Sequence, residues 1–300
     1  MTWNALCHPN VLPLLGITTG KNLFAMVSEW MVNENINEFV KAHREANPLE
    51  LVRFHSYHIP RLLLIRASSQ LKEVTSGLMY IHSQGMIHGD LKGVRLSMST
   101  CPMPSNAFSE KANILIDQDR HARLADFGLL TIVSDPTIFT TSSSVSTGGT
   151  IRWMSPELLH PELFGLDHGR PTKESDCYAL GMLIYEVLTG QAPFTPWKDH
   201  IVMRKVTDGE RLGRPEGVKG TWFTDGSWKM LGLCWETRAQ SRPSIKTVGE
   251  CLERISNTWK PFPPQVNESG EKDGNDWDLT VLTVWVFVLI YLTCLRKVPC

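Results

Sequence analysis

The stretch IHGDLKG at residues 87–93 is followed by ANILID at 112–117, LADFGL at 124–129 and GTIRWMSPE at 149–157. Each string is short, and an isolated Asp in HGD or DFG is more often a turn or cap residue than a catalyst. Their order carries the information, because a chance match becomes improbable when several motifs follow one another along a chain. The four strings together therefore decide the fold that we expect.

In this order the strings resemble the protein kinase family, and specifically its tyrosine-kinase-like (TKL) branch. The resemblance covers residues 3–259, because HPNVLPLLG, VSEWM, SDCYALGMLIYEVLTGQAPF, CW and SRPS also lie where that family has them. It implies an α+β, protein-kinase-like fold with a mainly α C-lobe and, in this chain, a truncated N-lobe that keeps a β-hairpin. The implied activity is ATP-dependent phosphorylation of Ser or Thr in protein substrates, with Mg²⁺.

The resemblance assigns chemical roles to residues in these strings. Asp90 would accept the proton of the substrate hydroxyl. Lys92 would contact the γ-phosphate, and a Lys at this position is typical of serine/threonine kinases rather than tyrosine kinases. Asn113 and Asp126 would hold Mg²⁺, since hard oxygen ligands suit that ion. Thr150 would support Asp90 and shape the loop that binds the substrate peptide.

The resemblance also implies where ATP would bind. The backbone of Glu29 and Met31 would meet the adenine at the hinge between the lobes. Ser28 would be the small residue at the back of the pocket, and Leu115 would form its floor.

Other residues in the motifs are expected to be structural. By the resemblance, Glu157 and Arg242 form the ion pair that ties the end of the activation segment to a late helix. Asp176 anchors the backbone of the catalytic loop. None of these three would touch substrate. We also expect five ring-bearing residues to be packed in the core rather than to bind a ligand: His88, Trp153, Trp222, Trp228 and Trp235.

Composition excludes several classes of function. With 30 basic and 31 acidic residues the net charge is -1, so no bulk electrostatic field favours nucleic acid. Seven cysteines, an odd number without metal-ligand spacing, fit a reducing compartment better than a disulfide framework or a zinc site. The first residues show no secretory signal, so we expect a cytoplasmic protein.

The hydrophobic pattern predicts the elements. The apolar runs VLPLLG and LFAMVSEWM, separated by ITTGKN, predict a short strand pair. Helical spacing is clearest in 71–85, where Gly85 caps the end. We expect further helices at 175–189, 228–234 and 245–255, and a loop at 135–149. The domain boundaries that follow are 1–31 for the N-lobe remnant and hinge, 32–260 for the C-lobe, 261–278 for an acidic, Pro-rich linker and 279–295 for an apolar segment.

The sequence departs from the family near its first residue. His8 follows Met1 by seven residues, so these 300 residues lack the Gly-rich loop, strand Lys and helix Glu that precede the HPN motif in kinases. Because phosphoryl transfer needs the Lys–Glu pair, we expect this chain to be weakly active or inactive. Two hypotheses stay open: an active kinase, or a pseudokinase that serves as a protein-interaction module.

Two segments interrupt the family pattern. Asn113 comes 23 residues after Asp90, and deleting 94–111 restores HGDLKGANILID. Deleting 52–70 restores unbroken helical spacing upstream. Both segments begin Val-Arg and end in Gln or Lys, which fits introns translated in frame. The alternative is a pair of genuine surface insertions, which cost little loop-closure free energy.

The run LTVLTVWVFVLIYLTCL at 279–295 carries no charge over seventeen residues. This length is at the low end of what spans a bilayer. The run could anchor the protein in a membrane, although Arg296 and Lys297 after it oppose the usual charge asymmetry. The alternatives are an exposed β-prone segment or translated noncoding sequence.

Overall fold

A computed structural model describes residues 3–20, 23–33, 35–36, 39, 58–93, 113–126, 131–132, 150–217, 220 and 223–258. All of these residues lie in one unit, Met1–Trp259. The predicted loop, second insertion, linker and apolar segment, together with Trp222, lie outside the described residues. None of the helices within the described ranges is long and apolar enough to cross a membrane.

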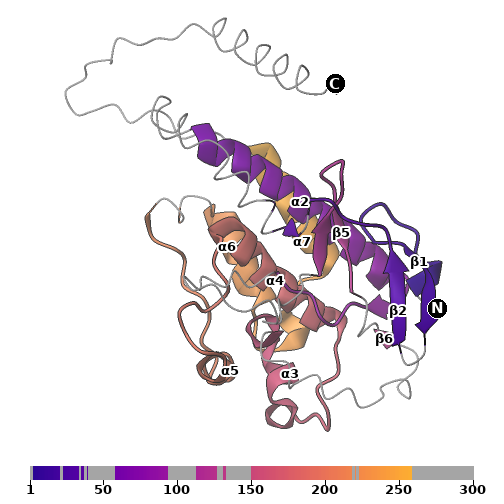
Figure 1. The fold of residues 1–300 in the computed structure, drawn as a ribbon. Coiled ribbons are helices and arrows are strands. Elements are labelled where there is room, and N and C mark those ends of the chain that lie inside the picture. The colour runs from indigo at the N-terminus through magenta and orange to yellow at the C-terminus, as the bar shows by residue number, and fades with distance from the viewer. Residues whose placement is uncertain are drawn as a thin grey trace, which may run out of the picture. The chain divides into compact units, whose positions relative to one another are not determined.

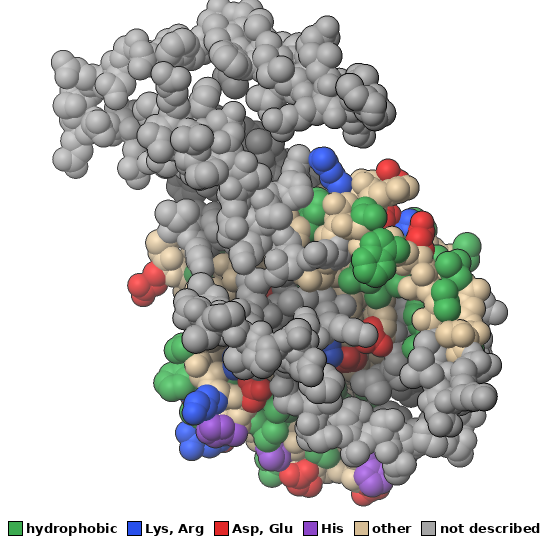
Figure 2. Space-filling view, viewed as in Figure 1, with side chains coloured by type: hydrophobic (Ala, Val, Ile, Leu, Met, Phe, Trp, Pro, Cys, Tyr) green, Lys and Arg blue, Asp and Glu red, His purple; other side chains and the backbone are tan. Residues whose placement is uncertain are grey.

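The predicted strand pair is present. Strand β1 (Leu14–Gly20) pairs antiparallel with β2 (Leu23–Ser28), and Ile17 lies opposite Met26. The strands extend beyond the apolar runs, because residues 17–20 of the predicted separator pair with β2, up to Gly20 opposite Leu23. Hydrophobic side chains are exposed on this pair (Figure 2), including Leu15, Ile17, Met26 and Val27.

Helix α2 (His58–Ser83) is the longest described element, with 26 residues. Its predicted apolar face is buried: Leu71, Val74, Leu78 and Ile81 are at most 1% exposed. The expectation that 52–70 interrupts this helix was wrong for residues 58–70, which continue it. Ala67 precedes Leu71 by four residues and is buried on the same face, so the helical spacing extends into this segment.

Three further helices confirm the predicted positions: α4 (Lys173–Thr189), α6 (Asp225–Cys234) and α7 (Ile245–Thr258). Helix α4 begins with a capping box, in which Thr172 and Ser175 each bind the other's backbone N–H through a side-chain hydroxyl. Most of α4 is buried, whereas α7 lies alongside α2 (Figure 1). Helix α4 therefore forms the centre of the helical core.

The aromatic residues near α6 pack as a cluster. The rings of Trp228 and Trp235 lie 5.7 Å apart, edge to face, and Phe223 lies 5.3 Å from Trp228. Trp153 and Trp235 are each 1% exposed. Trp153 and Trp235 belong to the core, as predicted, and Trp228 is half-buried and packs against it.

Short elements complete the described fold. They are the 3₁₀ turns η1 (Trp3–Ala5), η4 (Thr150–Trp153), η5 (Pro161–Phe164) and η7 (Ala239–Ser241), the helices α3 (Pro156–Leu159) and α5 (Asp199–Thr207), and the strands β3 (Met86–Ile87), β4 (Ile114–Ile116), β5 (Ala122–Leu124) and β6 (Thr131–Ile132). Strand β3 pairs with β6 and β4 pairs with β5, each antiparallel. Mostly helical content with small sheets agrees with the expected α+β fold.

Candidate active site

The loop that contains Asp90 is fixed to helix α4. Asp176, 1% exposed, accepts hydrogen bonds from the backbone N–H groups of His88 and Gly89, each at 2.9 Å. The same carboxylate lies 2.8 Å from Nε2 of His82. Gly89 has φ +78°, a conformation that glycine adopts without steric cost. The carboxylate therefore has the anchoring geometry that the resemblance implied.

His88 links the Asp90 loop to the backbone just before Asp126. Its Nδ1 accepts from the N–H of Asp90 at 3.3 Å, and its Nε2 lies 3.2 Å from the carbonyl oxygen of Ala125. These partners assign the proton to Nε2, since the carbonyl can only accept. His88 is fully buried, as expected for a packing residue, but it also makes polar contacts on both sides.

Asp90, Lys92 and Asn113 form one cluster. Oδ2 of Asp90 accepts from Nζ of Lys92 and from Nδ2 of Asn113, each at 2.9 Å. Nδ2 of Asn113 also donates to the backbone carbonyl of Asp90. The N–H of Asn113 donates to the carbonyl of Lys92 at 3.4 Å. Asn113 thus lies beside Asp90 although 23 positions separate them in the sequence.

A backbone hydrogen bond brings Asp126 close to Asn113. The N–H of Ala125 donates to the carbonyl of Asn113 at 2.8 Å, and Asp126 follows directly. Asp126 is exposed and has φ +57°. Within the described part of the chain, the buried Oδ1 of Asn113 has no hydrogen-bond partner. An amide oxygen without a partner and an exposed carboxylate are thus brought to the same end of β4 and β5.

The residues predicted to meet adenine range from buried to exposed. Met31 is 7% exposed and packs with Leu12, Ala125 and Leu115 in a small apolar cluster. Ser28 ends β2 and pairs with Leu14. Glu29 is exposed. The structure therefore joins Met31 to Leu115, and both lie next to the residue that precedes Asp126.

The turn between β4 and β5 is closed by one carboxylate. Asp117 accepts from the N–H groups of Asp119 and His121 and from Nε of Arg123. Burial by itself would raise the pKa of Asp117, but these donors and the guanidinium charge together lower it below the ordinary value. The side chain of Asp117 thus stabilises the turn of the β4–β5 hairpin by hydrogen bonds within the turn.

Glu73 on α2 contacts the same turn. Its Oε1 lies 2.8 Å from Nδ1 of His121, and its Oε2 accepts from the N–H of Ala122 at 2.7 Å. The hydrogen bond and charge of Glu73 raise the pKa of His121 above its ordinary value of 6.5. No motif in the sequence identified this contact, because the partners are 49 positions apart.

The raised pKa of His121 gives a testable pH dependence. A raised pKa in the folded state means that the imidazolium–Glu73 pair stabilises the fold below about pH 6.5 and that this contribution is lost as pH rises through the folded pKa. Because the His121 side chain is 59% exposed, we expect an effect below about 1 kcal/mol. An NMR titration should give a lower pKa for His121 in Glu73→Gln than in the unchanged chain. Equal values would contradict the pairing.

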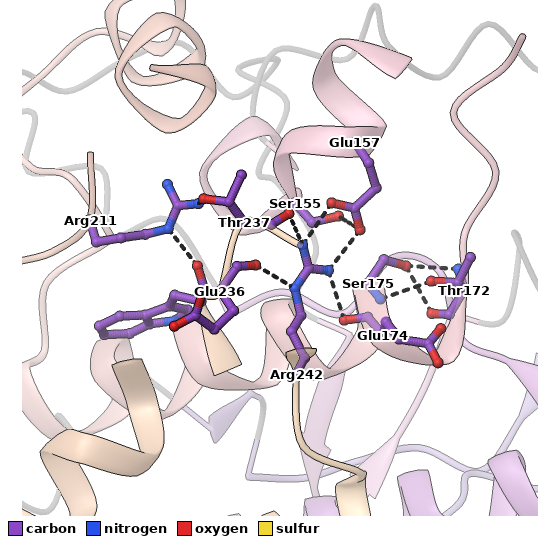
Figure 3. Close-up of polar contacts among 10 residues, drawn as sticks. Ser155, Glu157, Thr172, Glu174, Ser175, Arg211, Glu236, Thr237 and Arg242 are labelled. Carbon is purple, nitrogen blue, oxygen red and sulfur yellow. Dashed lines mark hydrogen bonds and ion pairs between the residues drawn. The ribbon is translucent and has the colours of Figure 1, made fainter. Parts of the chain in front are cut away.

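Glu157 and Arg242 form the ion pair that the resemblance implied (Figure 3). Both guanidinium nitrogens, Nη1 and Nη2, lie 2.7 Å from a carboxylate oxygen, and both side chains are buried. Arg242 also donates to the carbonyls of Glu174 and Glu236, and Ser155 donates to Glu157 at 2.7 Å. The network joins α3 and α4 to the loop before α7.

Arg152 is a buried anchor that the sequence did not reveal. Its guanidinium donates to the carbonyls of Pro193 and Trp197 and lies 2.9 Å from the Asp199 carboxylate. Nothing in the local pattern marks a buried Arg, because its partners follow more than forty positions later. The anchor fixes η4 to the loop between α4 and α5.

Thr150 begins η4, and only its backbone is among the described atoms. At the other end of η4, Nε1 of Trp153 donates to Oε2 of Glu186 on α4 at 3.0 Å. The turn that contains Thr150 is therefore held to α4 at its last residue.

A family model described as protein tyrosine and serine/threonine kinase matches residues 1–96 and 110–252. The match passes over 97–109, which lie inside the predicted second insertion, and it includes the first predicted insertion. The origin of both segments stays a prediction.

Similar curated proteins include kinases of both specificities. Receptor-interacting serine/threonine-protein kinase 3 of Rattus norvegicus is 29% identical over 85% of this chain and 46% of its own length. Tyrosine-protein kinase csk-1 of Caenorhabditis elegans is 27% identical over 84% of this chain and 38% of its own. Tyrosine-protein kinase Abl of Drosophila melanogaster is 26% identical over 83% of this chain and 12% of its own. The chain thus spans less than half the length of these relatives. On the family match, it belongs to the protein tyrosine and serine/threonine kinase family.

Proposed function

We propose that the chain is a protein kinase domain of the tyrosine-kinase-like branch, which phosphorylates Ser or Thr in proteins with ATP and Mg²⁺. The observation that carries this proposal is the contact of Asp90 with both Lys92 and Asn113. The choice of Ser and Thr rests on Lys92, two positions after Asp90. The similar kinases include proteins named as tyrosine kinases and proteins named as serine/threonine kinases, so the specificity of this chain needs its own test.

The donor atoms fit Mg²⁺. The buried Oδ1 of Asn113 has no hydrogen-bond partner among the described residues. A buried acceptor without a partner lowers the stability of the fold, because its desolvation is not compensated. Asp126 adds a carboxylate at the same end of the hairpin. Carboxylate and amide oxygens are ligands that Mg²⁺ prefers. When bound, Mg²⁺ would neutralise charge on the phosphates of ATP.

The protein residues would orient the reacting groups. Nδ2 of Asn113 and Nζ of Lys92 hold Oδ2 of Asp90, which leaves Oδ1 of Asp90 to accept the substrate hydroxyl proton. Lys92 would place a positive charge beside the transferring phosphoryl group. Asp176 and His88 keep the Asp90 backbone in place by the hydrogen bonds described above.

Nucleotide binding and phosphate transfer test the proposal. We expect the chain to bind ADP more tightly with Mg²⁺ than without it, and we expect Asp126→Asn to weaken binding of the Mg²⁺ complex at least about tenfold. Asp208→Asn, at an exposed Asp after α5, is the matched control and should bind as the unchanged chain does. Labelled ATP followed by phosphoamino-acid analysis separates Ser and Thr from Tyr. Mg²⁺-independent binding, or no difference between the two variants, would refute the cation site.

A role in protein interaction without catalysis is the second candidate. It is favoured by one observation, that residues 94–111 interrupt the family pattern between Lys92 and Asn113. Cation-dependent ADP binding without any phosphate transfer, or the absence of nucleotide binding in a folded chain, would support this candidate over the kinase.

A further inference from the structure

The two proposed cation ligands flank the β4–β5 hairpin in the sequence, one before its first strand and one after its second. Asn113 stands immediately before β4, and Asp126 follows β5 by two positions. The ends are joined by the hydrogen bond from Ala125 to the carbonyl of Asn113. The position of the hairpin therefore sets the position of both oxygen ligands.

One carboxylate on α2 holds the second strand of this hairpin. Oε2 of Glu73 accepts from the N–H of Ala122 at 2.7 Å, which is the distance of a charge-assisted hydrogen bond. The carbonyl of Ala122 in turn accepts from Nδ2 of Asn10 at 3.0 Å. Two side chains from different parts of the chain thus hold the backbone of Ala122 from both sides.

The approach of α2 to the hairpin is close as well as polar. Gly77 lies one helical turn after Glu73, so both face the same side of α2. A Cβ atom at Gly77 would lie 2.5 Å from the carbonyl oxygen of Asn10 and 3.0 Å from Cδ1 of Leu124. The helix therefore contacts β5 at two points, and these contacts fix its position along the strand.

The two halves of the candidate site are held by different helices. Asp90 is fixed to α4 through Asp176, whereas the hairpin is fixed to α2 through Glu73. We propose that Glu73 is a positioning residue for the divalent-cation site, acting through Ala122 on Asn113 and Asp126. This inference rests on the proposed function, because it takes these two residues as the cation ligands. Residues that orient ligands commonly change metal affinity about 10- to 100-fold when they are replaced.

The test uses Mn²⁺ as a spectroscopic probe in place of Mg²⁺. Binding of Mn²⁺ to the 300-residue chain with ADP is measured by electron paramagnetic resonance, well below the melting temperature. We expect Glu73→Ala to weaken Mn²⁺ binding about tenfold. Glu253→Ala, which removes an exposed carboxylate from α7, is the control and should have no effect. Glu73→Gln keeps a carbonyl oxygen for the N–H of Ala122 and should recover most of the affinity.

Hydrogen exchange supplies a readout that needs no cation. The amide of Ala122 should exchange faster in Glu73→Ala than in the unchanged chain, and Glu73→Gln should restore its protection. A lower melting temperature with unchanged Mn²⁺ affinity would overturn the positioning role, because a purely structural contact gives that result. If the unchanged chain binds no Mn²⁺, or if Asp126→Asn binds it equally well, the proposed function itself fails.

Discussion

Replacing Arg242 with alanine is expected to destabilise the folded chain by about 3–5 kcal/mol. The substitution leaves the Glu157 carboxylate buried, 5% exposed, without its bidentate partner. It also removes the donor that two backbone carbonyls use and the guanidinium that lies 5.2 Å from the ring centroid of Tyr178. Urea denaturation followed by circular dichroism measures the free energy of unfolding.

An exposed arginine provides the comparison for Arg242. Arg214 pairs with Asp225, but their side chains are 38% and 96% exposed, so Arg214→Ala should cost about 1 kcal/mol or less. Glu157→Gln keeps the shape of the side chain and should destabilise in the same direction as Arg242→Ala. If Arg242→Ala and Arg214→Ala cost the same, the buried pair does not hold the three segments together.

Asp176→Ala is expected to cost about 2–5 kcal/mol, because it leaves one buried and one half-buried backbone N–H group without their acceptor. Those groups belong to His88 and Gly89, in the loop that presents Asp90. The loss should therefore appear in two measurements. The free energy of unfolding falls. The amides of His88 and Gly89 exchange with solvent faster than in the unchanged chain, and this acceleration exceeds that of the amides of α7.

The matched control for Asp176 is Asp208→Ala, which removes an exposed carboxylate and should change stability by less than about 0.5 kcal/mol. Asp176→Asn is the informative intermediate. It keeps the size of the side chain but turns one acceptor into a donor, so it can satisfy one N–H group and opposes the other. Unchanged exchange of both amides in Asp176→Ala would contradict the anchoring role.

Local pattern in the sequence predicted the elements well. The apolar face of α2 and the positions of α4, α6 and α7 follow from helical spacing, which is a property of neighbouring residues. The start of α2 was missed because the helical spacing is clearest only from Leu71 onward, so residues 52–70 were interpreted as an interruption. Ala67, before that point, is buried on the same face.

The site could be predicted only where motifs exist. Asp90, Lys92 and Asn113 lie in contact although residues 94–111 separate the first two from the third, so the motifs themselves, and not their spacing, pointed to this cluster. The role of Glu73 could not be predicted in this way, because it depends on contacts with residues 121 and 122, far along the sequence, and no motif marks them. The buried side chain of Arg152 was missed for the same reason, since burial of a charge depends on the tertiary fold around it.

The edge-to-face contact of Trp228 with Trp235 provides an optical probe of the folded chain. Two indole rings 5.7 Å apart share their electronic excitation, so the pair contributes a circular-dichroism band of its own beside the helical signal. Trp228 lies in α6 and Trp235 directly follows its last residue, so the coupling exists only while α6 and its C-terminal end are formed. The pair therefore allows the unfolding of α6 to be followed separately from the total helical signal, in the unchanged chain and in every variant named above.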